Sequence, residues 1–327
     1  MIERVMRSRL ARWGFVGVAL VLAGVALARY WEQVREAAVD LNPLNLLVSA
    51  LLALVGTGFM VLAWRGVLAD LGTRLPLRVA ARVFTLSQLG KYIPGSVWPF
   101  LAQIELGREH GVPRRRSAAV GILLVGISLV SSLLVASITL PFAAEGVARA
   151  YWWALAATPV LIALLHPRLL NPTLDWTLRL VRRAPLEHGL SMSGVLAAAG
   201  WSVAAWVVYG LHVWVLAVDL GGSGPSLPLA SIGAFALAWS AGFVFVIAPA
   251  GAGVRELVLA AGLGPLLGVG PAVLLVIASR LLMTIGDLVW AGAGYVLGRR
   301  HAALVPGELE AALALQRARQ AAAESDG

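Results

Sequence analysis

Long apolar runs alternate with short polar segments along most of the chain, and the runs have the length of membrane-crossing helices. A helix needs roughly 17 to 25 apolar residues to cross a bilayer core about 30 Å thick. Runs that meet or approach this requirement lie at 13–28, 41–64, 117–140, 150–166, 195–218, 229–248 and 272–297. This pattern predicts an all-α polytopic membrane protein.

The segment 254–270 is too short and too rich in glycine for an ordinary span, so it is either a half-helix or a short crossing. If both termini are cytoplasmic, the number of crossings is even. We therefore expect seven to eight transmembrane helices, with eight fitting the charges better. The single membrane domain would occupy residues 1–298, followed by a cytoplasmic tail at 299–327.

Two breaks interrupt the apolar pattern. In 87–107 (SQLGKYIPGSVWPFLAQIELG), Pro94 must interrupt a helix and Gly95 permits a sharp reversal. The stretch 247–268 (IAPAGAGVRELVLAAGLGPLLG) follows the same plan from Pro249. Irregular backbone at membrane depth persists only where protein or a watered cavity surrounds it. The breaks therefore predict two re-entrant segments that share a cavity.

The residues after the two breaks continue alike, which predicts an internal repeat with halves at about 41–166 and 190–298. From Pro94 to the Ala-Val pair at 119–120 the chain advances 25 positions (119−94), and from Pro249 to the pair at 272–273 it advances 23 (272−249). Broken helices at corresponding positions of two halves are a sequence pointer to a transporter's binding site.

Composition supports the membrane class. Of the 327 residues, 59% are hydrophobic and 13% charged, and the mean hydropathy is +0.83, which leaves too few polar groups to cover a soluble globule. No cysteine is present, so disulfides, thiolate catalysis and cysteine metal sites are excluded. The net charge of +9 comes from arginine, because Lys91 is the only lysine among 26 basic residues.

In a membrane protein, such a basic excess usually records topology and anionic headgroups, and we expect no nucleic acid partner. The largest basic cluster lies in 65–116, and residues 1–12 also carry four arginines. The positive-inside rule places both segments in the cytoplasm. We expect a multi-pass protein of the cell (plasma or inner) membrane, with a cytoplasmic N-terminus and a cytoplasmic C-terminus.

Lys91 and Tyr92 directly precede the first break. An ammonium beside free backbone N–H groups at a turn suits a phosphate. The alternative is a lysine that snorkels to the interface. Gln103 and Glu105 follow the same break, and their role is less defined.

Four charged residues accompany the second break: Arg255, Glu256, Arg280 and Asp287. Arg280 and Asp287 are seven positions apart in the last run, so they lie on nearly one helix face. Unpaired charges at the bilayer centre are costly, so we expect Glu256 or Asp287 to pair with Arg280 across the cavity. The alternative is a purely structural ion pair. His212, near two aromatic residues, is expected to be a hydrogen-bonded core residue.

The motifs LGKYIPGSVWPF and APAGAGVRELVL, followed by ASRLL, resemble the lysylphosphatidylglycerol synthase transmembrane region, also described as the flippase-like or UPF0104 family. The resemblance covers about residues 10 to 298. Pro249, Gly251, Gly253 and Glu256 match the family's P-G-G-x-G-x-x-E pattern, with Arg280 downstream. Ala250 departs from that pattern. Val97-Trp98-Pro99 departs too, because many members place an acidic pair there.

The resemblance implies a lipid-translocating domain without the family's soluble aminoacyl-transferring domain. We therefore expect flippase-like movement of an anionic phospholipid or polyprenyl-phosphate-linked lipid between leaflets, without ATP, cofactor or metal. The substrate-binding candidates are Lys91, Tyr92, Pro94, Gly95, Gln103, Glu105, Pro249, Gly251, Gly253, Arg255, Glu256, Arg280 and Asp287.

We expect no catalytic residues, because no catalytic motif is found. The alternative is an integral-membrane glycosyl- or aminoacyl-transferase acting on a lipid phosphate, or the lipid-binding partner subunit of a separate transferase. A requirement for a divalent metal would favour it.

Overall fold

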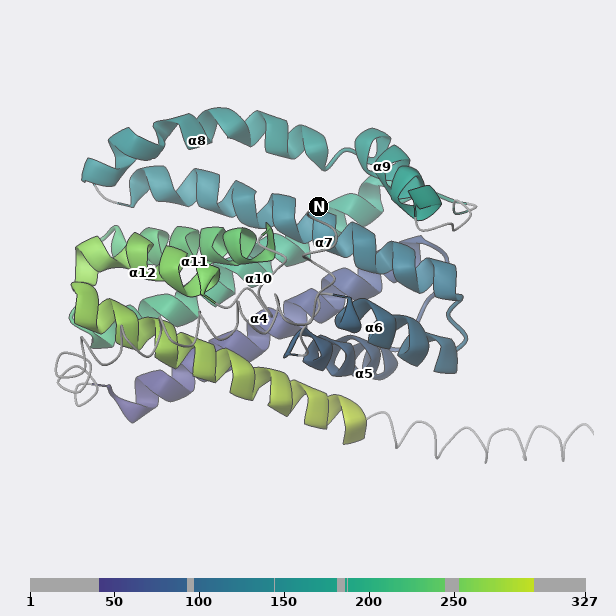
Figure 1. Cartoon of the computed structure of the whole chain (residues 1–327), viewed down its shortest axis with the longest axis horizontal. Helices are drawn as coiled ribbons and strands as arrows, with labels where there is room; N and C mark the ends of the chain where they lie inside the picture. Colours follow the sequence, from purple (N-terminus) through teal and green to yellow (C-terminus); the bar gives the residue numbers. More distant parts are fainter. Residues whose placement is uncertain are drawn as a thin grey trace, which may run out of the picture.

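The computed structural model consists of α-helices and short 3-10 helices wherever it describes regular structure (Figure 1). It describes residues 41–92, 97–143, 145–180, 186, 188–244 and 253–296, with the backbone alone for 145–154. The predicted all-α class is confirmed. The first predicted crossing, at 13–28, and the tail at 299–327 lie outside the described residues.

Five described segments are long and apolar enough to cross a bilayer, and they agree with the predicted runs to within a few residues at most ends. They are α4 (Pro43–Asp70), the segment Arg114–Phe142 formed by α7 (Arg114–Thr139) and η2 (Leu140–Phe142), α10 (Met192–Asp219), α11 (Leu227–Val244) and the final helix (Val269–Val296). The run predicted at 150–166 corresponds to α8 (Glu145–Leu164), which packs against α7, and α9 (Pro167–Leu180) follows it.

Helices α4 and α10 run antiparallel and are joined at both ends. At one end, Asp219 accepts hydrogen bonds from the Asn42 N–H (3.1 Å) and from the Asn45 side chain (2.5 Å). At the other end, Asp70 accepts from the N–H (2.7 Å) and hydroxyl (2.6 Å) of Ser191, the N-cap of α10. These four bonds fix the axial register of the pair.

A hairpin of two short helices follows α4. It consists of α5 (Leu77–Gln88), η1 (Leu89–Tyr92) and α6 (Trp98–Glu109), and α5 packs against α6. Each helix has 12 residues and is therefore about 18 Å long. A Cβ on Gly90 would lie 2.8 Å from backbone atoms of Trp98 and Pro99, so the tip requires glycine. Arg116 donates to the Gly72 carbonyl, which brings the hairpin's entry and exit together.

A second hairpin pairs α11 with α12 (Val254–Leu267). Gly253, with φ +89°, precedes α12, and Gly268, with φ +83°, separates α12 from the final helix. A Cβ on Gly222 would lie within 3 Å of the Leu227 and Leu267 side chains, so the open end of this hairpin lies beside the C-terminus of α10.

The two halves of the described chain thus share one order of helices: a long helix, a broken hairpin and a second long helix. Because α4 and α10 are antiparallel, the first hairpin opens at one end of the bundle and the second at the opposite end. Two units of inverted orientation have this arrangement. The duplication itself stays a prediction.

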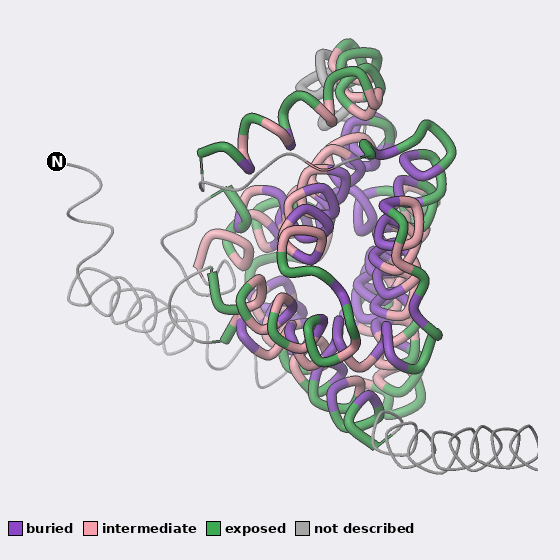
Figure 2. Tube along the Cα trace, turned by 90° about the vertical axis from the view of Figure 1, so that its right-hand side faces the viewer, coloured by how far each residue is buried: buried purple, intermediate pink, exposed green. Residues whose placement is uncertain are grey.

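Apolar side chains cover the outer faces as well as the core. Leu44, Leu47, Leu51 and Val55 form an exposed stripe on α4. The interior packs large side chains such as Trp64 and Trp206, while Figure 2 shows the exposed positions on the outer faces of the helices. An apolar exterior of this kind is suited to lipid contact.

Candidate functional site

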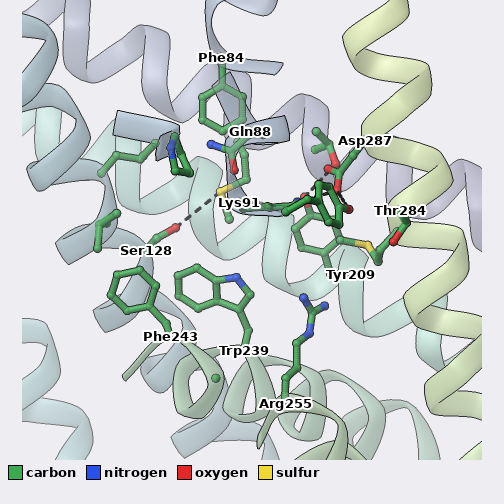
Figure 3. A pocket seen from close by; sticks show the side chains of 18 of the residues that line it. Phe84, Gln88, Lys91, Ser128, Tyr209, Trp239, Phe243, Arg255, Thr284 and Asp287 are labelled. Atoms are coloured by element: carbon green, nitrogen blue, oxygen red, sulfur yellow. Dashed lines mark hydrogen bonds and ion pairs between the residues drawn. The ribbon is translucent and has the colours of Figure 1, made fainter. Parts of the chain in front are cut away.

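A cavity of about 290 Å³ lies where the two hairpins meet (Figure 3). Residues of α4, α5, η1, α6, α7, α10, α11, α12 and the final helix contribute to its wall. Among the described elements, only η2, α8 and α9 contribute no lining residue. Its charged lining residues are Lys91, Arg255, Arg280 and Asp287.

Asp287 joins the tip of the first hairpin to the final helix. Its Oδ2 lies 2.6 Å from the Lys91 ammonium and accepts a hydrogen bond of 2.5 Å from the Tyr92 hydroxyl. Asp287 is 5% exposed, whereas the Lys91 side chain keeps 30% exposure. A carboxylate that is buried this deeply needs such partners. Lys91 is thus held by a carboxylate within the protein.

Glu256 joins the start of α12 to the final helix. Its Oε2 accepts from the Gly253 N–H at 2.7 Å, and its Oε1 lies 3.5 Å from a nitrogen of Arg280. The first contact satisfies a backbone donor that the helix start would otherwise leave open. The geometry therefore supplies one of the two pairings expected for Arg280.

Arg255 is adjacent to Glu256 in sequence, but its side chain lies in a different environment. Its guanidinium carbon lies 4.7 Å from the centre of the Phe235 ring, and Figure 3 shows the side chain extending toward the cavity from the side opposite Lys91. Within the described part of the chain it forms neither an ion pair nor a hydrogen bond. Stacking on an aromatic face leaves the N–H edge of a guanidinium available.

An aromatic wall completes the cavity. Phe235, Trp239 and Phe243 follow one another at four-residue spacing on α11, and all three line the cavity. Trp239 stacks on Phe243 with ring centres 5.4 Å apart and lies 4.5 Å from the ring of Trp206. The cavity thus combines a charged side with an aromatic side.

Of the two candidate residues that follow the first break, one lines the cavity and the other does not. Gln103 is 5% exposed and lines the cavity. Glu105 does not reach it: its carboxylate lies at the surface, 2.6 Å from Arg108 and 3.3 Å from Arg114. The hydrogen bond from Arg108 lowers the pKa of Glu105. The structure does not bring Glu105 together with the other candidates.

Four candidates, namely Pro94, Gly95, Pro249 and Gly251, lie outside the described residues. His212 is fully buried, and its ring contacts the Tyr209 carbonyl and, at 2.8 Å, the Ser279 hydroxyl. This agrees with the core role expected for it.

Sequence reasoning missed the aromatic wall and the polar groups beside it. The signal was the i, i+4, i+8 spacing of Phe235, Trp239 and Phe243, but such a stripe is more often part of a core. Thr57 and Tyr209, whose hydroxyls lie 3.0 Å apart, also line the cavity. Within the described chain, no group of three His, Asp or Glu residues is arranged to hold a metal.

The family model of the lysylphosphatidylglycerol synthase TM region matches residues 14–291. The chain belongs to this family. The match spans both hairpins and every described residue of the cavity, so the cavity is part of the family's shared region. A comparison with curated proteins finds no match.

Proposed function

We propose that this family member moves an anionic lipid between the two leaflets of a cell membrane without ATP. The observation that carries the proposal is the meeting of two broken hairpins, which open at opposite ends of the bundle, at one cavity with charged walls. In transporters, binding sites lie near the midplane at the interface of such repeats.

The distribution of charge supports one orientation of the bundle in the membrane. Arg74, Arg78 and the arginines at 114–116 lie at the end where the first hairpin opens. The described connections at the opposite end, 140–143, 219–226 and 268, carry no basic residue. By the positive-inside rule, the first hairpin would open toward the cytoplasm, the side to which the sequence analysis assigned these same arginines.

The length of the first hairpin fits a re-entrant segment. Helices α5 and α6 reach about 18 Å, a little over half of a hydrocarbon core of about 30 Å. The tip at Lys91 and Tyr92 would then lie near the middle of the bilayer, and the lining of the cavity would satisfy its irregular backbone.

An amphipathic ligand matches the two sides of the cavity. The charged side would bind the headgroup, and the aromatic side would contact the adjoining apolar part, while the acyl or prenyl chains stay in the bilayer. Rocking of the two halves about the cavity would expose it to each leaflet in turn. Without an energy source, such a protein equilibrates the leaflets or follows a gradient.

The test is lipid scrambling by the purified full chain in vesicles. The vesicles contain phosphatidylglycerol with a fluorescent label on one short acyl chain, which leaves the headgroup unchanged, and a reductant that does not cross the membrane quenches the outer leaflet. We expect full quenching with protein and outer-leaflet quenching alone without it. Lys91→Ala and Glu256→Gln should slow scrambling, whereas Arg78→Gln, on the exposed face of α5, should not.

A lack of scrambling for both phosphatidylglycerol and a polyprenyl phosphate would overturn the proposal. The next step would then be to look for a bound transferase, because the remaining role would be lipid binding on behalf of such an enzyme.

A further inference from the structure

The charges of the cavity do not balance. Lys91 is neutralised by Asp287 at 2.6 Å, and Arg280 faces Glu256 at 3.5 Å. These two pairs leave Arg255, whose described contact is the aromatic ring of Phe235. The described cavity therefore carries one positive charge in excess, and that charge belongs to Arg255.

The two breaks carry no acidic side chain in their undescribed residues. Residues 93–96 (IPGS) and 245–252 (FVIAPAGA) contain no acidic side chain. No carboxylate from either break can therefore neutralise Arg255.

The carboxylates of the site are already engaged. Asp287 accepts from the Lys91 ammonium and the Tyr92 hydroxyl through the same oxygen. Glu256 uses one oxygen for the Gly253 N–H and the other for Arg280. Each bond pairs one of these carboxylates with a hydrogen-bond donor at low dielectric. A ligand ammonium that contacted the second oxygen of Asp287 would share this carboxylate with Lys91, so it would gain no unmatched negative charge.

From this balance we propose that Arg255 binds the ligand phosphate, and that the cavity selects a phosphodiester with one negative charge over headgroups that also carry an ammonium. The proposal rests on the function proposed above and specifies its substrate class. It also moves the phosphate from Lys91, where the sequence placed it, to Arg255. A guanidinium can bind phosphate through two parallel N–H bonds, and that of Arg255 lies against the ring of Phe235.

Selectivity follows from the cost of burying charge. A phosphodiester monoanion neutralises Arg255 and leaves the cavity without excess charge. A zwitterionic headgroup brings an ammonium that finds no unmatched negative charge, and a cationic headgroup adds a second unmatched positive charge. A phosphate monoester with two negative charges leaves one charge uncompensated.

The test measures equilibrium binding, independently of transport. Purified full-length protein in an uncharged detergent is titrated with short-chain phosphatidylglycerol, phosphatidylethanolamine and phosphatidylcholine of equal chain length, and with a short-chain polyprenyl phosphate. We expect phosphatidylglycerol to bind at least about tenfold more tightly than the zwitterionic lipids, the size of one charge-assisted hydrogen bond. Free glycerol 3-phosphate and inorganic phosphate form separate arms, and tight binding of either would identify a soluble phosphate as the ligand in place of a lipid.

Substitutions of Arg255 test whether this residue causes the preference for phosphatidylglycerol. Arg255→Gln should bring phosphatidylglycerol down to the affinity of phosphatidylethanolamine, and Arg255→Lys should retain part of the preference because it keeps the charge. Arg78→Gln removes one arginine outside the cavity and should bind like the wild type. A monodisperse Arg255→Gln protein that keeps the preference, or a wild type without one, overturns the inference. If selective binding depends on Arg255 but scrambling is absent, the proposed function fails and the assignment of the phosphate stands.

Discussion

The ammonium of Lys91 lies 2.6 Å from the carboxylate of Asp287, so the tip of the first hairpin is bonded to the final helix. The hydroxyl of Tyr92 donates to the same carboxylate oxygen. Three side chains from the two halves of the chain therefore close one side of the cavity. Any motion that opens this side must break the ion pair or carry both elements together.

This contact predicts a coupling between Lys91 and Asp287 in stability. Asp287→Asn should destabilise the protein by about 2 kcal/mol, less than the 3 to 5 kcal/mol of a fully buried pair, because Lys91 remains partly exposed. Combining it with Lys91→Met removes the unmatched ammonium and should recover about half of that loss. Thermal unfolding of both single variants and the double variant in detergent checks this. A double variant with purely additive losses would show that the pair is not coupled.

Helix packing gives a second prediction, at Gly210 of α10. A Cβ there would overlap the backbone of Ile232 on α11, so Gly210→Ala should destabilise the protein by about 2 kcal/mol. Gly200 on the same helix faces open space, and Gly200→Ala should be neutral or stabilising by up to about 1 kcal/mol. The two variants differ in position alone, and their unfolding temperatures should move apart. Equal shifts would contradict the packing of α10 against α11.

Glu105 provides a third prediction, at the surface. Because Arg108 lowers its pKa, the carboxylate stays charged at neutral pH. Whatever stability the pair adds is present above the ordinary pKa of glutamate and disappears as the pH falls through the lowered value. Wild type and Glu105→Gln should therefore unfold alike at low pH and differ slightly at neutral pH, with equal scrambling rates. A Glu105→Gln protein that loses scrambling would return this residue to the binding site.

The long helices could be predicted because their lengths are set by the bilayer and their composition by lipid. The break between α5 and α6 was also predicted, because Pro94 removes a backbone donor and Gly95 permits a reversal directly after it. The ends of the helices were predicted less accurately. Helix α7 begins at Arg114, three residues before the predicted span, because its first turn carries charged residues that an apolar run excludes.

The pairing of charges depended on tertiary contacts. The sequence limited the acidic partner of Arg280 to Glu256 or Asp287. Glu256 is identified only by the structure, in which the start of α12 lies beside Arg280 on the final helix. That Asp287 binds Lys91 instead could not be anticipated, because no periodicity relates η1 to the final helix. Arg255 was named as a candidate, but its special position follows from the pairing of its neighbours.

The most direct test of the central claim, that lipid passes through the cavity between the hairpins, uses the absence of cysteine from the chain. Ser128 is buried and lines the cavity, and Ser128→Cys introduces a single thiol with little change in volume. The protein is labelled with a bulky uncharged methanethiosulfonate, the labelling is measured by mass, and phosphatidylglycerol scrambling is recorded. Thr173→Cys, exposed on α9, receives the same label as a control. The account predicts that labelled Ser128→Cys loses scrambling and regains it when a reductant removes the label, while labelled Thr173→Cys stays active. Undiminished scrambling by fully labelled Ser128→Cys would contradict it.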